Sequence, residues 1–272
     1  MEQAAPIGIF DSGIGGLTVV KELRRLLPNE NLIYVGDTAR VPYGSREPAE
    51  ILSFMKQTLN FLESHKVKIA VFACNTMTTY GLKLARQKYN FWVIPMNSGI
   101  SVAASLSASR KIGVIATHGT VENEMHRKAA EAMAIPVAIY AKACPEFVPL
   151  IENGQITGAK LELAAEKSLQ FFQGSGVDSL ILGCTHYPLI SNIIQKYVGE
   201  NVHLVNPALA TAQDTVDYLK SVGQLNDSNQ PGNLKFYFSA DLERARRMVK
   251  LVLNTNKAEF RQVDLTQYQE SV

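Results

Sequence analysis

The chain has 272 residues, of which 46% are hydrophobic and 19% charged, and its formal net charge is +2. This composition is typical of a soluble globular protein with room for two domains, and without a basic run it gives no sign of a nucleic-acid partner. Since no apolar stretch approaches the roughly 20 residues of a membrane-spanning helix, and the N-terminal residues lack the basic start of a signal peptide, we expect a cytoplasmic protein without membrane contact.

Strand and helix patterns alternate along the first part of the chain. Each apolar run of strand character is followed by a turn or by an amphipathic segment with helical spacing, such as Ile51 to Leu62. The expected strands are Ile7–Phe10, Leu32–Val35, Lys68–Cys74 and Trp92–Pro95.

The same alternation continues to the end of the chain. The expected strands are Ile112–Ile115, Val137–Tyr140, Ser179–Cys184, Val202–Val205 and Leu234–Phe238. The expected helices are Ala159–Phe172, Ser191–Tyr197 and Asp241–Val252, the last of which leads to a polar tail. Alternation of this kind predicts an α/β protein with mostly parallel sheets and helices on both faces.

An internal repeat divides the chain into two similar halves. Ile7-Gly8-Ile9-Phe10 resembles Ile112-Gly113-Val114-Ile115 at a distance of 105 positions, and Cys74 and Cys184 lie 110 positions apart. We therefore predict two pseudo-symmetric three-layer αβα domains, residues 1–97 plus 211–272 and residues 98–210. The active site is expected in the cleft between them.

Polar residues follow several of the predicted strands. Asp11, Ser12, Cys74, Thr117 and Cys184 all come at the carboxyl end of a strand. Ligands of open α/β sheets bind at that edge. The sequence therefore predicts that these residues form the functional site.

The two cysteines stand in matching contexts. Cys74 precedes Asn75 and Thr76, whereas Cys184 precedes Thr185 and a histidine. A helix beginning at such a turn lowers the pKa of the thiol, and its N–H groups can hold a carboxylate. Two such thiols suit a reaction that needs a base on one face of a substrate and an acid on the other, while the polar neighbours suit the charged groups of an amino acid.

Asp11, His186 and Glu152 are the candidates for assisting proton transfer. Burial beside apolar residues could raise the pKa of Asp11, and His186 could share a proton with Cys184 or Glu152. Each has a structural alternative: Asp11 as a loop cap and Glu152 as a solvated helix end. The third cysteine, Cys144, is expected to be a buried hydrophobic residue, and three histidines are expected at the surface: His65, His126 and His203.

Two familiar ligand sites are not predicted. Asp11-Ser12-Gly13-Ile14-Gly15-Gly16 follows a strand, but it does not fit the dinucleotide pattern G-x-G-x-x-G. Three cysteines without a C-x-x-C pair predict neither a disulfide framework nor a metal site.

Five segments together resemble the glutamate racemase family, within the aspartate/glutamate racemase superfamily. They occur in the family's order and span most of the chain: Asp11–Val19, Tyr34–Gly44, Ala73–Thr76, Ala143–Pro149 and Gly183–Leu189. The chain departs from the usual family pattern at Pro95–Gly99, Met77–Thr79, Ala116 and Asn206–Pro207.

The resemblance implies interconversion of L- and D-glutamate without a cofactor or metal, with D-glutamate supplied to peptidoglycan synthesis. It implies that Cys74 takes the α-proton of D-glutamate and Cys184 that of L-glutamate. Asp11 would assist the first thiol, and His186 with Glu152 the second. The family also commonly forms homodimers.

The resemblance further implies a set of substrate contacts. They are Asp11, Ser12, Tyr43, Gly44, Asn75, Thr76, Thr185 and His186. The Tyr43-Gly44 turn would face the side-chain carboxylate. We expect the length of the substrate side chain to be set around Tyr43 to Arg46 and Thr117 to Thr120.

Two alternatives remain open from the sequence. One is a racemase for aspartate or another acidic amino acid, built on the same two thiols. The other is a two-lobed amino-acid-binding protein without catalysis, which explains the two halves but gives no reason for the matched cysteines.

Overall fold

Two separate parallel sheets organise the chain in the computed structural model, which describes residues 3–255 and 257–269. The described residues up to Met96 and from Ala208 onward form unit 1, and Asn97–Pro207 form unit 2. Helices cover the sheets, so the predicted α/β fold class with two mostly parallel sheets is confirmed.

The sheet of unit 1 has the strand order β10-β9-β2-β1-β3-β4, and its neighbouring strands are parallel. All residues of β1, β2 and β3 are buried, as expected for apolar strands covered on both faces. The strands are β1 (Ile7–Asp11), β2 (Leu32–Gly36), β3 (Ile69–Phe72), β4 (Trp92–Ile94), β9 (Leu234–Phe238) and β10 (Glu259–Gln262).

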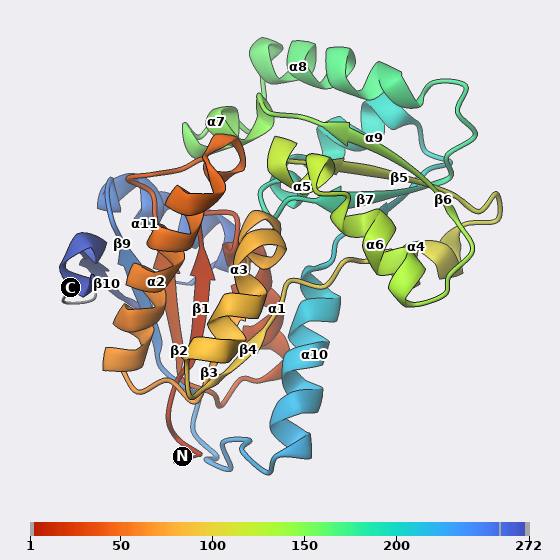
Figure 1. The fold of residues 1–272 in the computed structure, drawn as a ribbon. Helices are drawn as coiled ribbons and strands as arrows, with labels where there is room; N and C mark the ends of the chain where they lie inside the picture. Colours follow the sequence, from red (N-terminus) through yellow and green to blue (C-terminus); the bar gives the residue numbers. More distant parts are fainter. Residues whose placement is uncertain (1–2, 256, 270–272) are drawn as a thin grey trace. The chain divides into compact units, whose positions relative to one another are not determined.

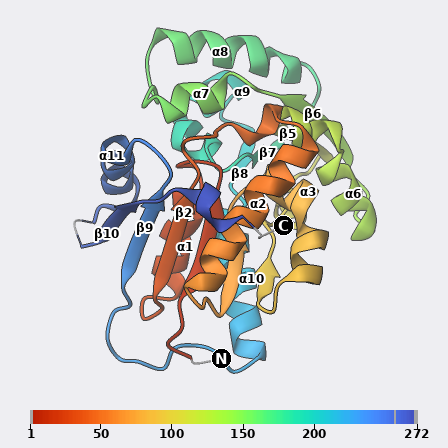
Figure 2. The same cartoon turned by 60° about the vertical axis from the view of Figure 1, so that its left-hand side comes forward.

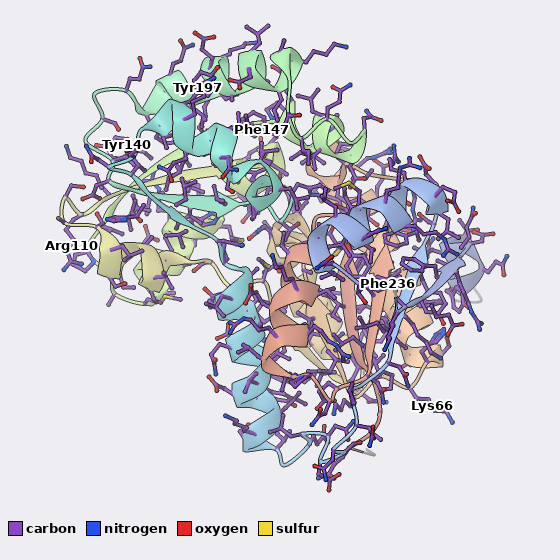
Figure 3. All side chains as sticks on the ribbon, turned by 180° about the vertical axis from the view of Figure 1, so that it is seen from behind. Lys66, Arg110, Tyr140, Phe147, Tyr197 and Phe236 are labelled. Carbon is purple, nitrogen blue, oxygen red and sulfur yellow. The ribbon has the colours of Figure 1, made fainter. Side chains whose placement is uncertain are left out.

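Helices lie on both faces of this sheet (Figures 1 and 3). One face carries α1 (Leu17–Leu26), α10 (Ala208–Ser221) and α11 (Leu242–Leu253), which contact one another through α1. The other carries α2 (Pro48–Ser64), α3 (Asn75–Lys88) and the 3-10 helix η4 (Leu265–Tyr268), and a second short 3-10 helix, η1 (Tyr43–Ser45), precedes α2. Helix α2 starts at a capping box between Glu47 and Glu50, with proline as its first residue.

Unit 2 contains the sheet β6-β5-β7-β8, also parallel (Figure 2). Its strands are β5 (Lys111–Ala116), β6 (Ala138–Ala143), β7 (Ser179–Gly183) and β8 (His203–Val205). The contacting helices on one side are α4 (Ile100–Leu106), α5 (His118–Glu122) and α6 (Met125–Ala132). Those on the other are α7 (Phe147–Glu152), α8 (Ala159–Leu169) and α9 (Ser191–Val198), with the 3-10 helices η2 (Gln170–Phe172) and η3 (Tyr187–Ile190).

The predicted repeat is visible in the strand order. The first four strands of unit 1 lie in the order second, first, third, fourth, and the four strands of unit 2 lie in the same order. Ile7 pairs with Ile69 in one sheet, and Ile112 pairs with Ser179 in the other. Cys74 and Cys184 each follow the third strand of their sheet, so they occupy equivalent places.

Two expectations from the sequence are corrected here. The polar tail after α11 contains β10, an edge strand that pairs with β9 and is half-exposed, which weakens its apolar signal. His126 does not lie at the surface: it is buried at 3% exposure in α6.

Among the described residues, none of the helices combines the length and apolar character needed to cross a membrane.

Candidate functional site

Asp11, the last residue of β1, and Ser12 begin a tightly packed turn of unit 1. Both side chains are buried, and an oxygen of the Asp11 carboxylate accepts a hydrogen bond from the backbone N–H of Gly13 at 2.8 Å. Gly16 leaves no room for a side chain, because an added Cβ would lie 2.7 Å from the Cβ of Asp11. The turn therefore fixes the Asp11 carboxylate at the carboxyl edge of the sheet.

Cys74 lies beside this turn, directly before α3. It has extended backbone angles and 6% exposure, and its carbonyl accepts the first hydrogen bond of the helix, from Thr78 at 3.0 Å. The N-terminus of this 14-residue helix carries partial positive charge, which stabilises a thiolate. The predicted strand-to-helix turn is therefore present at Cys74.

Asn75 and Thr76 form the buried first turn of α3. Neither polar atom of the Asn75 amide group has a hydrogen-bond partner among the described residues, although both are buried. A buried amide without a partner costs free energy, and at the end of a sheet it is suited to a polar ligand.

The Tyr43–Gly44 turn is anchored by a buried carboxylate. The hydroxyl of Tyr43 donates a hydrogen bond to Asp37, which follows β2 and is fully buried. Burial raises the pKa of Tyr43 well above its ordinary value, and the negative charge of Asp37 adds to this effect. The same carboxylate accepts hydrogen bonds from Arg40 and Ser239 at 2.6 and 2.8 Å.

Unit 2 brings Cys184, His186 and Glu152 together. The Nδ1 atom of His186 lies 3.7 Å from the Cys184 sulfur, and its Nε2 atom lies 2.6 Å from the Glu152 carboxylate. Burial alone would lower the pKa of His186, but the hydrogen bonds to Cys184 and Glu152 outweigh it and hold that pKa well above the usual value. The raised pKa favours the charged imidazole, and a charged donor next to a sulfur stabilises a thiolate.

The chain after Cys184 differs from the chain after Cys74. It enters a turn and the short 3-10 helix η3, with the N–H of Tyr187 donating to the carbonyl of Cys184 at 3.0 Å. The predicted α-helix N-terminus is thus absent immediately after Cys184, and the positive charge comes from His186 instead.

The remaining predicted residues of unit 2 follow β5 and β7. Thr117 occupies the N-cap position of α5, and its hydroxyl lies 3.1 Å from that of Thr120, a fully buried residue of the same helix. Thr185 is buried next to Cys184. Tyr187, to which no role was assigned from the sequence, donates to the carbonyls of Ala116 and Cys144 and so joins η3 to the end of β5 and to the segment after β6.

Cys144 is buried, and burial raises the pKa of its thiol to about 12. At neutral pH the thiol is therefore protonated and uncharged. This agrees with the prediction that Cys144 is a buried hydrophobic residue. Among residues 3–255 and 257–269, no group of three His, Cys, Asp or Glu side chains is arranged to hold a metal ion.

Comparison with known proteins identifies the family. Residues 7–215 match the model of the family described as Asp/Glu/Hydantoin racemase. The glutamate racemase of Thermoanaerobacter sp. (strain X514) is 41% identical over 264 residues, which cover 97% of this chain and 98% of that protein. The chain therefore belongs to the Asp/Glu/hydantoin racemase family, and the predicted enzyme class of amino-acid racemase is confirmed.

Solved structures agree with this assignment. The glutamate racemase of Francisella tularensis subsp. tularensis SCHU S4, in complex with D-glutamate, is similar with a TM-score of 0.89 at 35% identity, covering 98% of this chain and 100% of that chain. The glutamate racemase isoform RacE1 of Bacillus anthracis gives a TM-score of 0.91 at 32% identity, covering 97% and 99%.

Proposed function

We propose that this chain is a glutamate racemase that interconverts L- and D-glutamate with two cysteine thiols and no cofactor. The observation that carries the proposal is the equivalent placement of Cys74 and Cys184, each after the third strand of a sheet with the same strand order. Each thiol also has a neighbouring group that stabilises its anion, the N-terminus of α3 in one unit and His186 in the other.

The proposed reaction moves one proton at each face of the α-carbon. The Cys74 thiolate takes the α-proton of D-glutamate and becomes a thiol, leaving a carbanion at the α-carbon. The Cys184 thiol then gives its proton to the opposite face, which yields L-glutamate and a Cys184 thiolate. In the reverse direction the two residues exchange roles, so the proposal requires that both sulfur atoms reach the same substrate carbon.

The carbanion needs stabilisation because the α-proton of an amino acid is a very weak acid. Fixed N–H dipoles and buried polar side chains can supply it at low cost, since they need not reorganise during the reaction. We assign this role to the first turn of α3 with Asn75 and Thr76, and to Thr185 in unit 2. Asp11 assists Cys74, and His186 with Glu152 assists Cys184.

Glutamate is the proposed substrate because the relatives with about 40% identity are glutamate racemases and a similar structure contains D-glutamate. The substrate contacts are those implied by the sequence, with Ser12, the Tyr43–Gly44 turn, Thr117 and Thr120 among them. We also propose that the protein is cytoplasmic, that it forms a homodimer, and that its D-glutamate is used for peptidoglycan synthesis. The proposed domains are residues 1–97 plus 211–272 and residues 98–210.

Proton exchange in D₂O tests the proposal. L- and D-glutamate are incubated separately with the protein, and the loss of the α-proton is followed by NMR while optical rotation reports inversion. We expect exchange and inversion from both enantiomers, and Cys74→Ala and Cys184→Ala should each abolish inversion. Cys144→Ala is the matched control and should retain it.

The alternatives predict different results. Exchange of aspartate but not glutamate would replace the substrate while keeping the mechanism. Absence of exchange from any acidic amino acid, together with binding, would favour the non-catalytic binding protein. Full activity of Cys74→Ala would exclude the two-thiol mechanism.

A further inference from the structure

Arg40 contacts the residues that hold the Tyr43–Gly44 turn in place. Its Nε atom donates to the Asp37 carboxylate at 2.6 Å, on the same oxygen that accepts the Tyr43 hydroxyl. Its Nη1 atom donates to Gln57 of α2 at 2.5 Å. The guanidinium group also lies over the ring of Phe54, 4.1 Å from its centre.

Phe54 in turn packs on Tyr43, with ring centres 5.3 Å apart. Tyr43 is therefore held at two points, its hydroxyl by Asp37 and its ring by Phe54, and Arg40 contacts both of these residues. A lysine could not do the same, because only the planar guanidinium group stacks on a ring and donates hydrogen bonds along its edge.

Charge adds to the geometric argument. Asp37 is fully buried, and a buried carboxylate without a countercharge is strongly unfavourable. Arg40 forms an ion pair with Asp37, and the same carboxylate also accepts hydrogen bonds from the hydroxyls of Tyr43 and Ser239. Loss of Arg40 would leave the Asp37 anion buried beside the tyrosine that it orients.

We infer that Arg40 is a positioning residue that fixes the Tyr43–Gly44 turn for recognition of the substrate's side-chain carboxylate. This inference rests on the proposed function, which places that carboxylate at the turn. Tyr43 directs its hydroxyl to Asp37, so the anchored side chain sets the position of the turn rather than supplying a free hydroxyl to the substrate.

Arg40 lines a surface cavity of about 460 Å³. Asp37, Arg40, Ser239, Gln262, Asp264 and Thr266 are among its lining residues. A small cation entering this cavity could therefore replace the guanidinium group in an Arg40→Ala variant. This access makes chemical rescue possible.

Steady-state kinetics of Arg40→Ala test the inference. We expect KM for glutamate to rise about tenfold, because a change of this size corresponds to the loss of one charge-assisted hydrogen bond. We expect kcat to change less than about threefold. Methylguanidinium at millimolar concentration should restore part of the lost affinity, and ammonium should not. Arg40→Lys should lie between wild type and Arg40→Ala.

Arg86→Ala is the matched control. Arg86 also lies over an aromatic ring, that of Trp92 at 4.5 Å, but its guanidinium group donates to the carbonyl of Val93 and not to a support of the Tyr43–Gly44 turn. Its removal should leave KM unchanged and give no response to methylguanidinium.

A double-mutant cycle identifies the route of the effect. In a Tyr43→Phe background, Arg40→Ala should raise KM by much less than in the wild type, because the hydroxyl anchor is already absent. Equal effects in both backgrounds, or an unchanged KM in folded Arg40→Ala, would overturn the inference.

NMR separates failure of this inference from failure of the proposed function. The ring signals of ¹³C-labelled tyrosine, with Tyr43 assigned from Tyr43→Phe, report the turn without substrate. We expect the Tyr43 signal of Arg40→Ala to shift and broaden, and an unchanged signal would contradict the inference even if the wild type racemised no glutamate.

Discussion

The imidazole of His186 lies 2.6 Å from the carboxylate of Glu152, and both side chains are buried. The opposite nitrogen of the ring lies against the Cys184 sulfur. The carboxylate therefore orients the ring, and together with Cys184 it raises the pKa of His186. Cys74 has the N-terminus of α3 in the corresponding role, and a helix end does not titrate.

Replacement of Glu152 by Gln should therefore change the pH profile. Since Glu152 helps to raise the pKa of His186, the variant should lose the charged imidazole at lower pH, and the basic limb of kcat/KM should move to lower pH. We expect about a tenfold to hundredfold loss of activity at pH 8.

Glu162→Gln is the control for this measurement. Glu162 pairs with Lys196 and Tyr197 on the surface of the same unit and should leave the profile unchanged. A profile of Glu152→Gln that coincides with wild type would show that the carboxylate has no effect on the titration of His186.

The three thiols should react with iodoacetamide at different rates. The pKa of about 12 leaves Cys144 almost entirely protonated at pH 8, so its alkylation should be slower than that of an ordinary thiol by on the order of a thousandfold. Cys74 and Cys184 should be labelled first in the folded protein, as read by peptide mass spectrometry. In urea all three should react alike, and early labelling of Cys144 without urea would contradict its burial.

His126 should make stability fall in acid. Burial lowers its pKa from 6.5 to about 4, so below pH 6.5 the unfolded chain takes up a proton that the folded chain refuses. The stability is present above pH 6.5 and is lost as the pH falls to about 4, by about 3 kcal/mol. Urea unfolding between pH 7 and pH 4 measures this loss.

His126→Gln should reduce the slope of stability against pH in that window. The exposed His203 provides the control, since His203→Gln should retain the wild-type slope. If His126→Gln keeps the full slope, the acid loss belongs to other groups.

Removing one partner of the buried ion pair between Lys68 and Glu30 should destabilise the fold. Their charged atoms are 2.6 Å apart, and the ammonium group also donates to the carbonyls of Gln3 and Gln224. Lys68→Met should lower the free energy of unfolding by about 3 to 5 kcal/mol, because it leaves the Glu30 anion buried. The double variant Lys68→Met with Glu30→Leu should lose less free energy of unfolding than Lys68→Met alone. Denaturant titration measures both losses, and additive losses of the two single changes would show that the pair is not coupled.

Much of the fold and of the candidate site could be predicted because the signals are local. Apolar strands ending in small polar residues place Asp11, Cys74 and Cys184 at the carboxyl edges of parallel sheets, whatever the details of packing. The spacing of similar segments also predicted two similar halves, and the shared strand order is an observation that agrees with this repeat. The assignment of these residues to catalysis is a proposal that the D₂O experiment tests.

Other features depend on contacts that a linear pattern does not contain. Arg40 contacts residues from the end of β2 to the middle of α2, so its place follows only from the folded arrangement. The burial of His126 had one weak signal, since Ala130 lies four positions later and is also buried in α6. Because histidine is a polar residue, the sequence favoured a position at the surface.

The common strand order of the two sheets has a consequence for the origin of the chain. The same order of four strands in both units is the pattern that duplication of one such unit would leave, with one thiol in each copy. The two copies would since have diverged, because unit 1 has gained β9 and β10, and the thiol has a helix N-terminus beside it in one unit and a histidine in the other.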